Sequence, residues 1–272
     1  MSDHPSRLQP RRQPGRRPWW EAVEVRPGRT LRLALGPLTI RLGHGDGEWL
    51  LARTHDPETG QTSSVRRQVR RGRPETIDAR FVHAGDSDTV RLVPRLADRP
   101  VVIRPRQPIE LLGNQSTTLY LSTPVWVAIE VGDPGIALGE YPVVRLSDTW
   151  FGRSTREGEL CYSGRTHARH QPDDLPRRAH RAITPLTIHN RADDRLALEK
   201  IALPVPMLAL YGRADATMVT QGVTLTRESG GDLAGVRVDT TAPDEDLARL
   251  SEPRLESGRF GVTRALDLLF GA

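Results

Sequence analysis

Histidine and carboxylate side chains gather in one stretch of the sequence, and these groups bind zinc and iron in proteins. Four of the eight histidines lie between positions 167 and 189. The group comprises His167, His170, His180 and His189, with Cys161, Asp173 and Asp174 nearby. The spacing does not match the His-Glu-x-x-His pattern that places two ligands on one helix face. A metal-dependent enzyme or ligand-binding protein that uses the His167–His189 region is therefore an alternative hypothesis, and a His-rich polar connection is the simpler one.

Other patterns that support catalysis are incomplete. Cys161 is the only cysteine, and no base can be paired with it, so a small buried residue is expected. Gly43, Gly45 and Gly47 precede a strand-like run, which indicates a hairpin turn rather than a dinucleotide-binding loop. Lys200 has no glycine beside it and does not fit a phosphate-binding loop. The sequence therefore assigns no catalytic, cofactor-binding or metal-binding residue, and we expect a non-catalytic protein that needs no cofactor.

Two runs of arginine could contact anions. The N-terminal twenty residues hold five arginines against one aspartate, a charge of +4 out of the total of +5. The second run supplies the candidate partner contacts Arg66, Arg67, Arg70 and Arg71. This run is a solvated loop, a contact with a protein or membrane surface, or a contact with nucleic acid. Nucleic acid ranks last, because no aromatic residue between Arg53 and Arg80 could stack on bases.

Short strands must position these residues. From Trp19 onward, apolar and polar residues alternate, and Pro- and Gly-rich turns interrupt the runs. This pattern is typical of an all-β sandwich or barrel. Asp133-Pro134-Gly135 predicts one of the turns, because proline fixes φ and glycine tolerates positive φ. Residues 55–76 are polar and rich in arginine, which predicts a long loop or a frayed hairpin tip.

The pattern predicts two sandwich-like halves behind a basic tail. Residues 1–18 contain almost no apolar side chains and are expected to be disordered. Residues 19–169 are expected to form an N-terminal β-sandwich, and 170–182 a connection. Residues 183–272 are expected to form a second, immunoglobulin-like half with a short C-terminal helix.

Two helices are expected near the C-terminus. Threonine followed by proline and acidic residues predicts a helix over residues 240–250. The last residues predict a second helix, with Val262, Leu266, Leu269 and Phe270 on one face. That face closes the core or docks in a partner's groove, so its last three residues are further candidate contacts.

The composition also limits the cellular setting. No run of about 18 apolar residues is present, so no membrane-spanning helix is predicted. The charged N-terminus is not followed by the apolar segment of a secretory signal. A single cysteine excludes an internal disulfide. These features predict a cytoplasmic protein.

One block of the sequence resembles a known family. Residues 146–152 read LSDTWFG and residues 158–162 read GELCY. From about Val90 to its end, the chain is similar to the uncharacterised family called domain of unknown function 432. The resemblance implies no activity for any residue. Members often accompany small mechanosensitive channels of bacteria and archaea in gene order, which implies a soluble partner of a membrane channel.

The same block contains three further candidate contacts, Asp148, Trp150 and Phe151, because aromatic anchors favour interfaces. Taken together, the residues and the resemblance predict a non-catalytic cytoplasmic binding or regulatory module. Its expected partner is a protein, a small mechanosensitive channel, which would place it at the periphery of the inner membrane. A channel of several subunits would also imply several copies of this chain, and so a homo-oligomer.

Overall fold

The computed structural model consists of strands joined by short connections. It describes residues 18–61, 64–82, 87–152, 154–166, 168–228, 234–244 and 247–256. The helices in these ranges are the short 3-10 turns η1 (Pro57–Gln61), η2 (Pro172–Asp174) and η3 (Val205–Met207). The predicted all-β class is confirmed. Residues 1–17 of the predicted tail, and the predicted terminal helix with Leu266, Leu269 and Phe270, lie outside the described residues. None of the described helices is long and apolar enough to cross a membrane.

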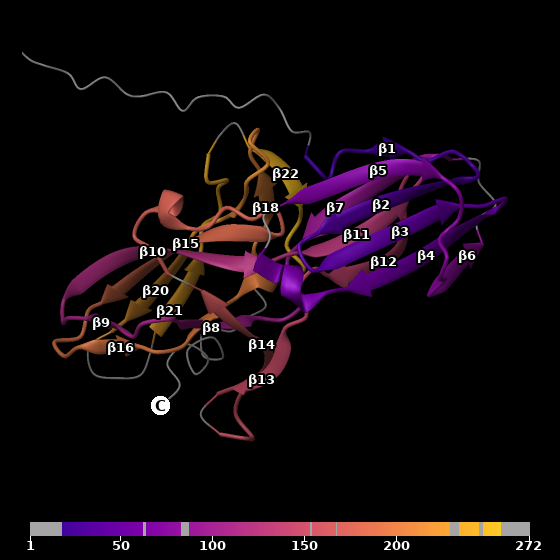
Figure 1. The fold of residues 1–272 in the computed structure, drawn as a ribbon. Coiled ribbons are helices and arrows are strands. Elements are labelled where there is room, and N and C mark those ends of the chain that lie inside the picture. Colours follow the sequence, from indigo (N-terminus) through magenta and orange to yellow (C-terminus); the bar gives the residue numbers. More distant parts are fainter. Residues whose placement is uncertain are drawn as a thin grey trace, which may run out of the picture.

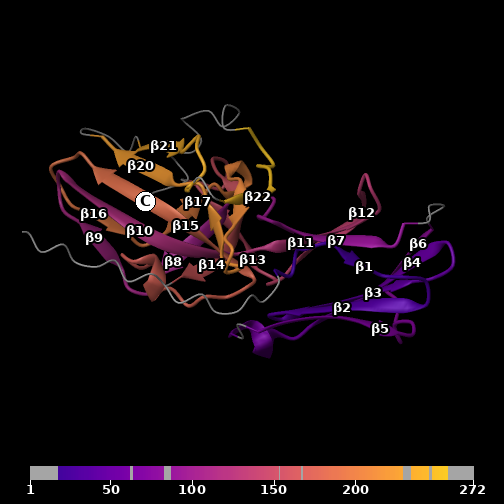
Figure 2. The same cartoon turned by 90° about the horizontal axis from the view of Figure 1, so that it is seen from above.

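The first lobe is a sandwich of two sheets (Figures 1 and 2). A five-stranded sheet has the order β5-β2-β3-β4-β6, and a four-stranded sheet has the order β1-β7-β11-β12. The first comprises β2 (Arg29–Leu35), β3 (Leu38–His44), β4 (Glu48–His55), β5 (Val65–Arg71) and β6 (Ala79–Val82). The second comprises β1 (Val23–Glu24), β7 (Thr89–Arg95), β11 (Trp126–Val131) and β12 (Ile136–Pro142).

Alternation in the sequence gives each sheet one apolar face, because successive side chains in a strand point to opposite sides. In β2, Leu31, Leu33 and Leu35 are fully buried, whereas Arg32 is exposed. In β7, the buried Leu92 faces the same core from the other sheet. Burial of each such side chain contributes about 2 kcal/mol. The core therefore lies between the sheets, and each sheet keeps one outer face.

The second lobe has mixed sheets. Its main sheet runs β21-β20-β15-β19-β18-β22, with β10 also paired to β15, and smaller sheets run β13-β14-β8-β17 and β16-β9. The strands are β8 (Val101–Pro105), β9 (Ile109–Leu111), β10 (Gln115–Pro124), β13 (Ser147–Phe151), β14 (Glu159–Thr166), β15 (Arg181–Asn190), β16 (Leu196–Leu198), β17 (Ile201–Leu203), β18 (Leu210–Gly212), β19 (Met218–Thr220), β20 (Val223–Arg227), β21 (Ala234–Val238) and β22 (Ala248–Ser251). The pairs β14–β8, β15–β19 and β15–β20 are parallel. An immunoglobulin sandwich has antiparallel sheets, so the topology of this lobe differs from that expectation.

The two lobes do not divide the chain at the predicted connection, residues 170–182. Strand β10 pairs with β15 from Gln115↔Asn190 to Pro124↔Arg181, and β8 pairs with β17. Sheets therefore join residues from both sides of the predicted boundary. The chain passes between the lobes after β7, after β10 and after β12.

The predicted connection instead contacts the first lobe. The indole Nε1 of Trp19 donates to the Ala179 carbonyl at 2.9 Å, and the Val125 amide donates to the His180 carbonyl at 3.0 Å. His180 is buried against Gly36, where a Cβ atom would lie 2.8 Å from the His180 Nδ1 atom. The segment therefore helps to hold the lobes together.

Local turn signals are confirmed, but one helix prediction is wrong. A turn around Gly47, whose φ is 65°, joins β3 to β4. A turn at Asp133-Pro134 joins β11 to β12 as expected, but the glycine with positive φ there is Gly132, at 85°, and not Gly135. Residues 248–250, predicted as the end of a helix, lie in β22 (Ala248–Ser251), which pairs with β18. Pairing with a distant strand outweighs the local capping signal there, because propensity is a weak preference.

Candidate functional site

The second arginine run lies on a strand rather than in a loop. Strand β5 pairs with β2 along its whole length, from Val65↔Leu35 to Arg71↔Arg29. The prediction of a long loop or a frayed hairpin tip over residues 55–76 is therefore wrong for residues 65–71. Val65 and Val69 are half-buried toward the core of the sandwich, and β5 is the edge strand of the five-stranded sheet.

Alternation splits the arginines of this run between the two faces of the sheet. Arg66 and Arg70 are exposed on the outer face. Arg67 lies opposite Leu33 on the inner side, where its Nη1 donates to the carbonyls of Trp19 and Glu21 at 3.2 and 2.5 Å. Arg67 therefore has a structural role, because it binds the segment that precedes β1.

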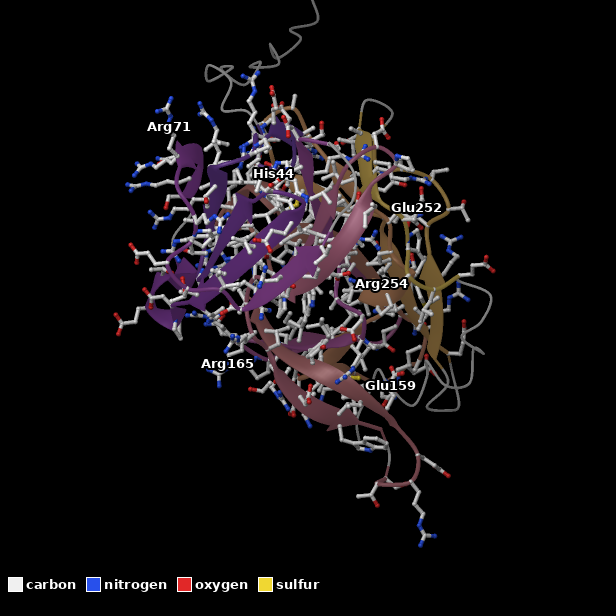
Figure 3. All side chains as sticks on the ribbon, turned by 90° about the vertical axis from the view of Figure 1, so that its right-hand side faces the viewer. His44, Arg71, Glu159, Arg165, Glu252 and Arg254 are labelled. Carbon is white, nitrogen blue, oxygen red and sulfur yellow. The ribbon has the colours of Figure 1, made fainter. Side chains whose placement is uncertain are left out.

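Arg71 lies at the end of β5, opposite Arg29 of β2. It is exposed, and Figure 3 shows its side chain at the outer edge of the first lobe. Of the four predicted contacts in this run, Arg66, Arg70 and Arg71 are thus at the surface.

Two arginines that the sequence analysis did not select complete the outer face. Arg32 of β2 lies directly opposite Arg41 of β3 on one side and opposite Gln68 of β5 on the other. Arg66 and Arg70 flank Gln68 and are therefore diagonal neighbours of Arg32, at about 7–8 Å between Cα atoms. We call Arg32, Arg41, Arg66 and Arg70 the arginine face. The alternation in TLRLAL and LTIRLG could have indicated both missed residues, because it places them on one side of adjacent strands.

The charge of the arginine face is not balanced within the described residues. No Asp or Glu occupies an outward position of β2, β3 or β5. None of the four arginines has an ion pair with another described residue. Like charges directly opposite each other destabilise a sheet, so the Arg32–Arg41 pair has an energetic cost. This cost would be offset by an anion bound across the face.

Protection of the sheet edge is a competing explanation. Charged side chains on an edge strand discourage pairing with another chain, and β5 is an edge strand. That explanation covers Arg66 and Arg70. It does not cover Arg32 and Arg41, because β2 and β3 lie inside the sheet with both neighbours paired. The two interior arginines therefore favour a binding role.

The predicted contacts in the 146–152 block have separate environments. Strands β13 and β14 form a hairpin that projects from the second lobe (Figure 1). Asp148 is exposed and pairs with Arg99 Nη1 at 3.2 Å. Trp150 is 48% exposed, and its Nε1 donates to the Ser154 carbonyl at 2.8 Å. Phe151 is only 4% exposed and belongs to the core, so it is not a surface contact.

The histidines of the alternative hypothesis do not form a metal site within the part of the chain that the structure describes. No group of three His, Cys, Asp or Glu side chains there is placed to hold a metal ion. His170 is exposed, His180 is buried between the lobes, and Nδ1 of His189 lies 2.6 Å from the Ser116 hydroxyl. His167 lies outside the described residues.

Cys161 is fully buried in β14, as expected for a small core residue. Burial, together with the nearby Glu159 carboxylate, raises the pKa of its thiol to about 12. At neutral pH the group is therefore a protonated thiol, which is a weak nucleophile.

Comparisons with known proteins give a family but no activity. A family model described as "Protein of unknown function (DUF432)" matches residues 19–269. No curated protein and no solved structure matches the chain. The resemblance expected from Val90 onward is thus confirmed and extends back to residue 19.

Proposed function

Because the chain belongs to the DUF432 family of proteins of unknown function, which assigns no activity, we propose a function from the arginine face. The protein is a non-catalytic cytoplasmic binding module that docks its arginine face on the anionic surface around a membrane channel. The observation that carries this proposal is the set of four outward arginines without carboxylate partners on β2, β3 and β5.

The strength of such an interaction can be estimated. A basic residue close to an anionic membrane surface contributes about 1 kcal/mol. Four arginines would contribute about 4 kcal/mol, which corresponds to roughly a thousandfold in affinity. The N-terminal residues, with five more arginines, precede the segment that Arg67 binds beside β5. They would strengthen the same interaction.

The chemistry of the arginine face supports a headgroup or protein surface over nucleic acid. The outward positions of β2, β3 and β5 carry Thr, Ala, Gly, Gln and Arg, and no aromatic side chain. Proteins that bind single strands commonly stack bases on aromatic residues, and this face offers no such platform. The choice of a small mechanosensitive channel as the partner comes from the family resemblance.

The experiment compares nanodiscs of phosphatidylcholine and phosphatidylglycerol that contain a small mechanosensitive channel with empty nanodiscs of the same lipids. We expect the protein to bind the discs with the channel more tightly than the empty ones. The R32E/R41E variant should lose this binding, and R165E, which removes an exposed arginine of β14, should retain it. Equal or no binding to the two discs would reject the channel as partner. Retention on duplex DNA without binding to discs would replace the proposal with nucleic-acid binding.

A further inference from the structure

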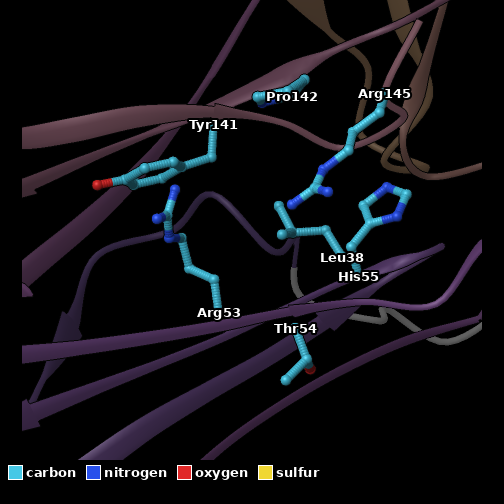
Figure 4. Close-up of a pocket in the computed structure, with 7 residues that line it drawn as sticks. All are labelled: Leu38, Arg53, Thr54, His55, Tyr141, Pro142 and Arg145. Carbon is cyan, nitrogen blue, oxygen red and sulfur yellow. The ribbon is translucent and has the colours of Figure 1, made fainter. Parts of the chain in front are cut away.

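A small cavity opens between the two sheets of the first lobe, away from the arginine face. Its volume is about 110 Å³, several times the space that one water molecule requires. It is lined by Leu38, Arg53, Thr54, His55, Tyr141, Pro142 and Arg145 (Figure 4). Strand β4 forms one wall, and β12 with the residues that follow it forms the other. The lining brings two guanidinium groups and one imidazole to the same space.

Arg53 is held in place with part of its guanidinium free. The ring of Tyr141 covers it, with 4.2 Å between the guanidinium carbon and the ring centroid. Asp78 Oδ2 accepts from the Arg53 backbone amide at 2.7 Å and from its Nε at 3.4 Å. The two terminal nitrogens of Arg53 have no partner among the described residues. They are therefore available to donate to a ligand.

Arg145 faces the same space from the opposite wall. It is exposed and has no carboxylate partner within the described ranges. Figure 4 shows its guanidinium beside the His55 ring, with the Arg53 guanidinium on the other side of the cavity. The Nε2 atom of His55 lies 3.2 Å from the Val143 carbonyl, which fixes that nitrogen as a donor to the backbone. The ring orientation is thus set by the protein.

The charges around the cavity are unequal. Two arginines and no carboxylate are among its lining residues, and Asp78 pairs with Arg53 only through the Arg53 Nε atom. Guanidinium groups bind oxyanions through paired N–H donors in a planar fork. We infer that the cavity between β4 and β12 is a binding site for a small oxyanion of the size of phosphate, held between Arg53 and Arg145. This site is independent of the proposed docking function, because it lies at the opening of the sandwich rather than on its outer face.

The test measures binding of inorganic phosphate by calorimetry at constant ionic strength, together with the thermal midpoint of unfolding. Wild-type protein should bind phosphate, and its midpoint should rise in phosphate relative to chloride. The R145A variant should bind at least tenfold more weakly. R145K should also bind more weakly, because lysine keeps the charge but loses the fork.

The matched control is R237A, which removes an exposed arginine of β21 in the second lobe, outside the cavity lining, and should bind phosphate as the wild type does. Because Arg145 is exposed, its replacement is expected to leave folding intact, and the unfolding midpoint in chloride checks this directly. The inference is overturned if wild-type protein binds no phosphate, or if R145A and wild type bind it with equal affinity.

Discussion

The two outer faces of the first lobe carry arginines in opposite electrostatic settings. On the four-stranded sheet, Arg91 lies 3.8 Å from Asp133, and Arg95 lies 3.6 Å from Glu130. Arg254, from the C-terminal segment, pairs with Glu140 on the same side. We call these three pairs the paired face. On the five-stranded sheet, the four residues of the arginine face have no such partners among the described residues.

This difference shows that the surroundings of an arginine say more about binding than the number of arginines in the sequence. All basic residues except Lys200 are arginine, so 38 of the 39 basic side chains carry a guanidinium wherever they occur. The abundance of arginine therefore says little about binding. The lack of carboxylates beside four neighbouring arginines is a stronger signal, because isolated like charges in a sheet have a cost that ion pairs remove.

The largest expected effect is the loss of membrane binding when the arginine face is reversed in charge. In R32E/R41E, each reversal should change the interaction with an anionic surface by about 2 kcal/mol, so affinity should fall by about a thousandfold. Co-sedimentation with vesicles of phosphatidylcholine and phosphatidylglycerol at low salt measures this. If the double variant binds vesicles as tightly as the wild type, the arginine face does not make the membrane interaction, and the two faces do not differ in function.

A second variant separates Arg67 from its neighbours on β5. R67M should lower the free energy of unfolding by about 2 kcal/mol, because its charged donor serves two backbone carbonyls. Vesicle binding should be unchanged. Denaturant unfolding provides the measurement, and R66M is the control, with an expected change below about 0.5 kcal/mol. Equal stability of R67M and R66M would show that the inner and outer arginines of β5 do not differ.

On the paired face, the E140Q variant should affect stability but not binding. The side chains of Arg254 and Glu140 are 23% and 25% exposed, so the pair is partly shielded from solvent. Removal of the carboxylate charge should lower the free energy of unfolding by about 1 kcal/mol, since Arg254 also donates to the Leu96 carbonyl and retains that partner. A large loss of vesicle binding in E140Q would contradict the prediction that the paired face takes no part in membrane binding.

The smallest expected effect is a gain in stability on the arginine face. R41Q removes the like-charge contact with Arg32, so the free energy of unfolding should rise by about 0.5 kcal/mol. Thermal unfolding at low salt should show the gain, and added salt should reduce it by screening the charges. A loss of stability would mean that Arg41 has favourable contacts that outweigh the repulsion.

The features that could be predicted from sequence are those set by neighbouring residues. The positions of the turns at Asp133-Pro134 and near Gly47 follow from the local proline and glycine residues, although Gly132 and not Gly135 takes the positive φ. The leucines at alternate positions of β2 predict a strand with one buried side. Each of these depends on residues a few positions apart, which the sequence shows directly.

The features that sequence reasoning missed depend on contacts between distant segments. The pairing of β10 with β15 joins residues across the predicted boundary, and no local pattern specifies that register. The polar, arginine-rich composition of residues 55–76 predicts a long loop or a frayed hairpin tip, whereas β5 is a strand because it pairs with β2. Arg32 and Arg41 come together with Arg66 and Arg70 only when β2, β3 and β5 lie side by side. The family match identifies relatives across residues 19–269 but does not locate the site.

The most direct test removes the same amount of charge from each face. R32Q/R41Q and R91Q/R95Q each remove two arginines, so the net charge changes equally, and both are measured for binding to vesicles that contain phosphatidylglycerol at low salt. We predict that R32Q/R41Q binds about thirtyfold more weakly, whereas R91Q/R95Q binds like the wild type. Equal losses in the two variants would show that total charge, rather than the arginine face, determines binding.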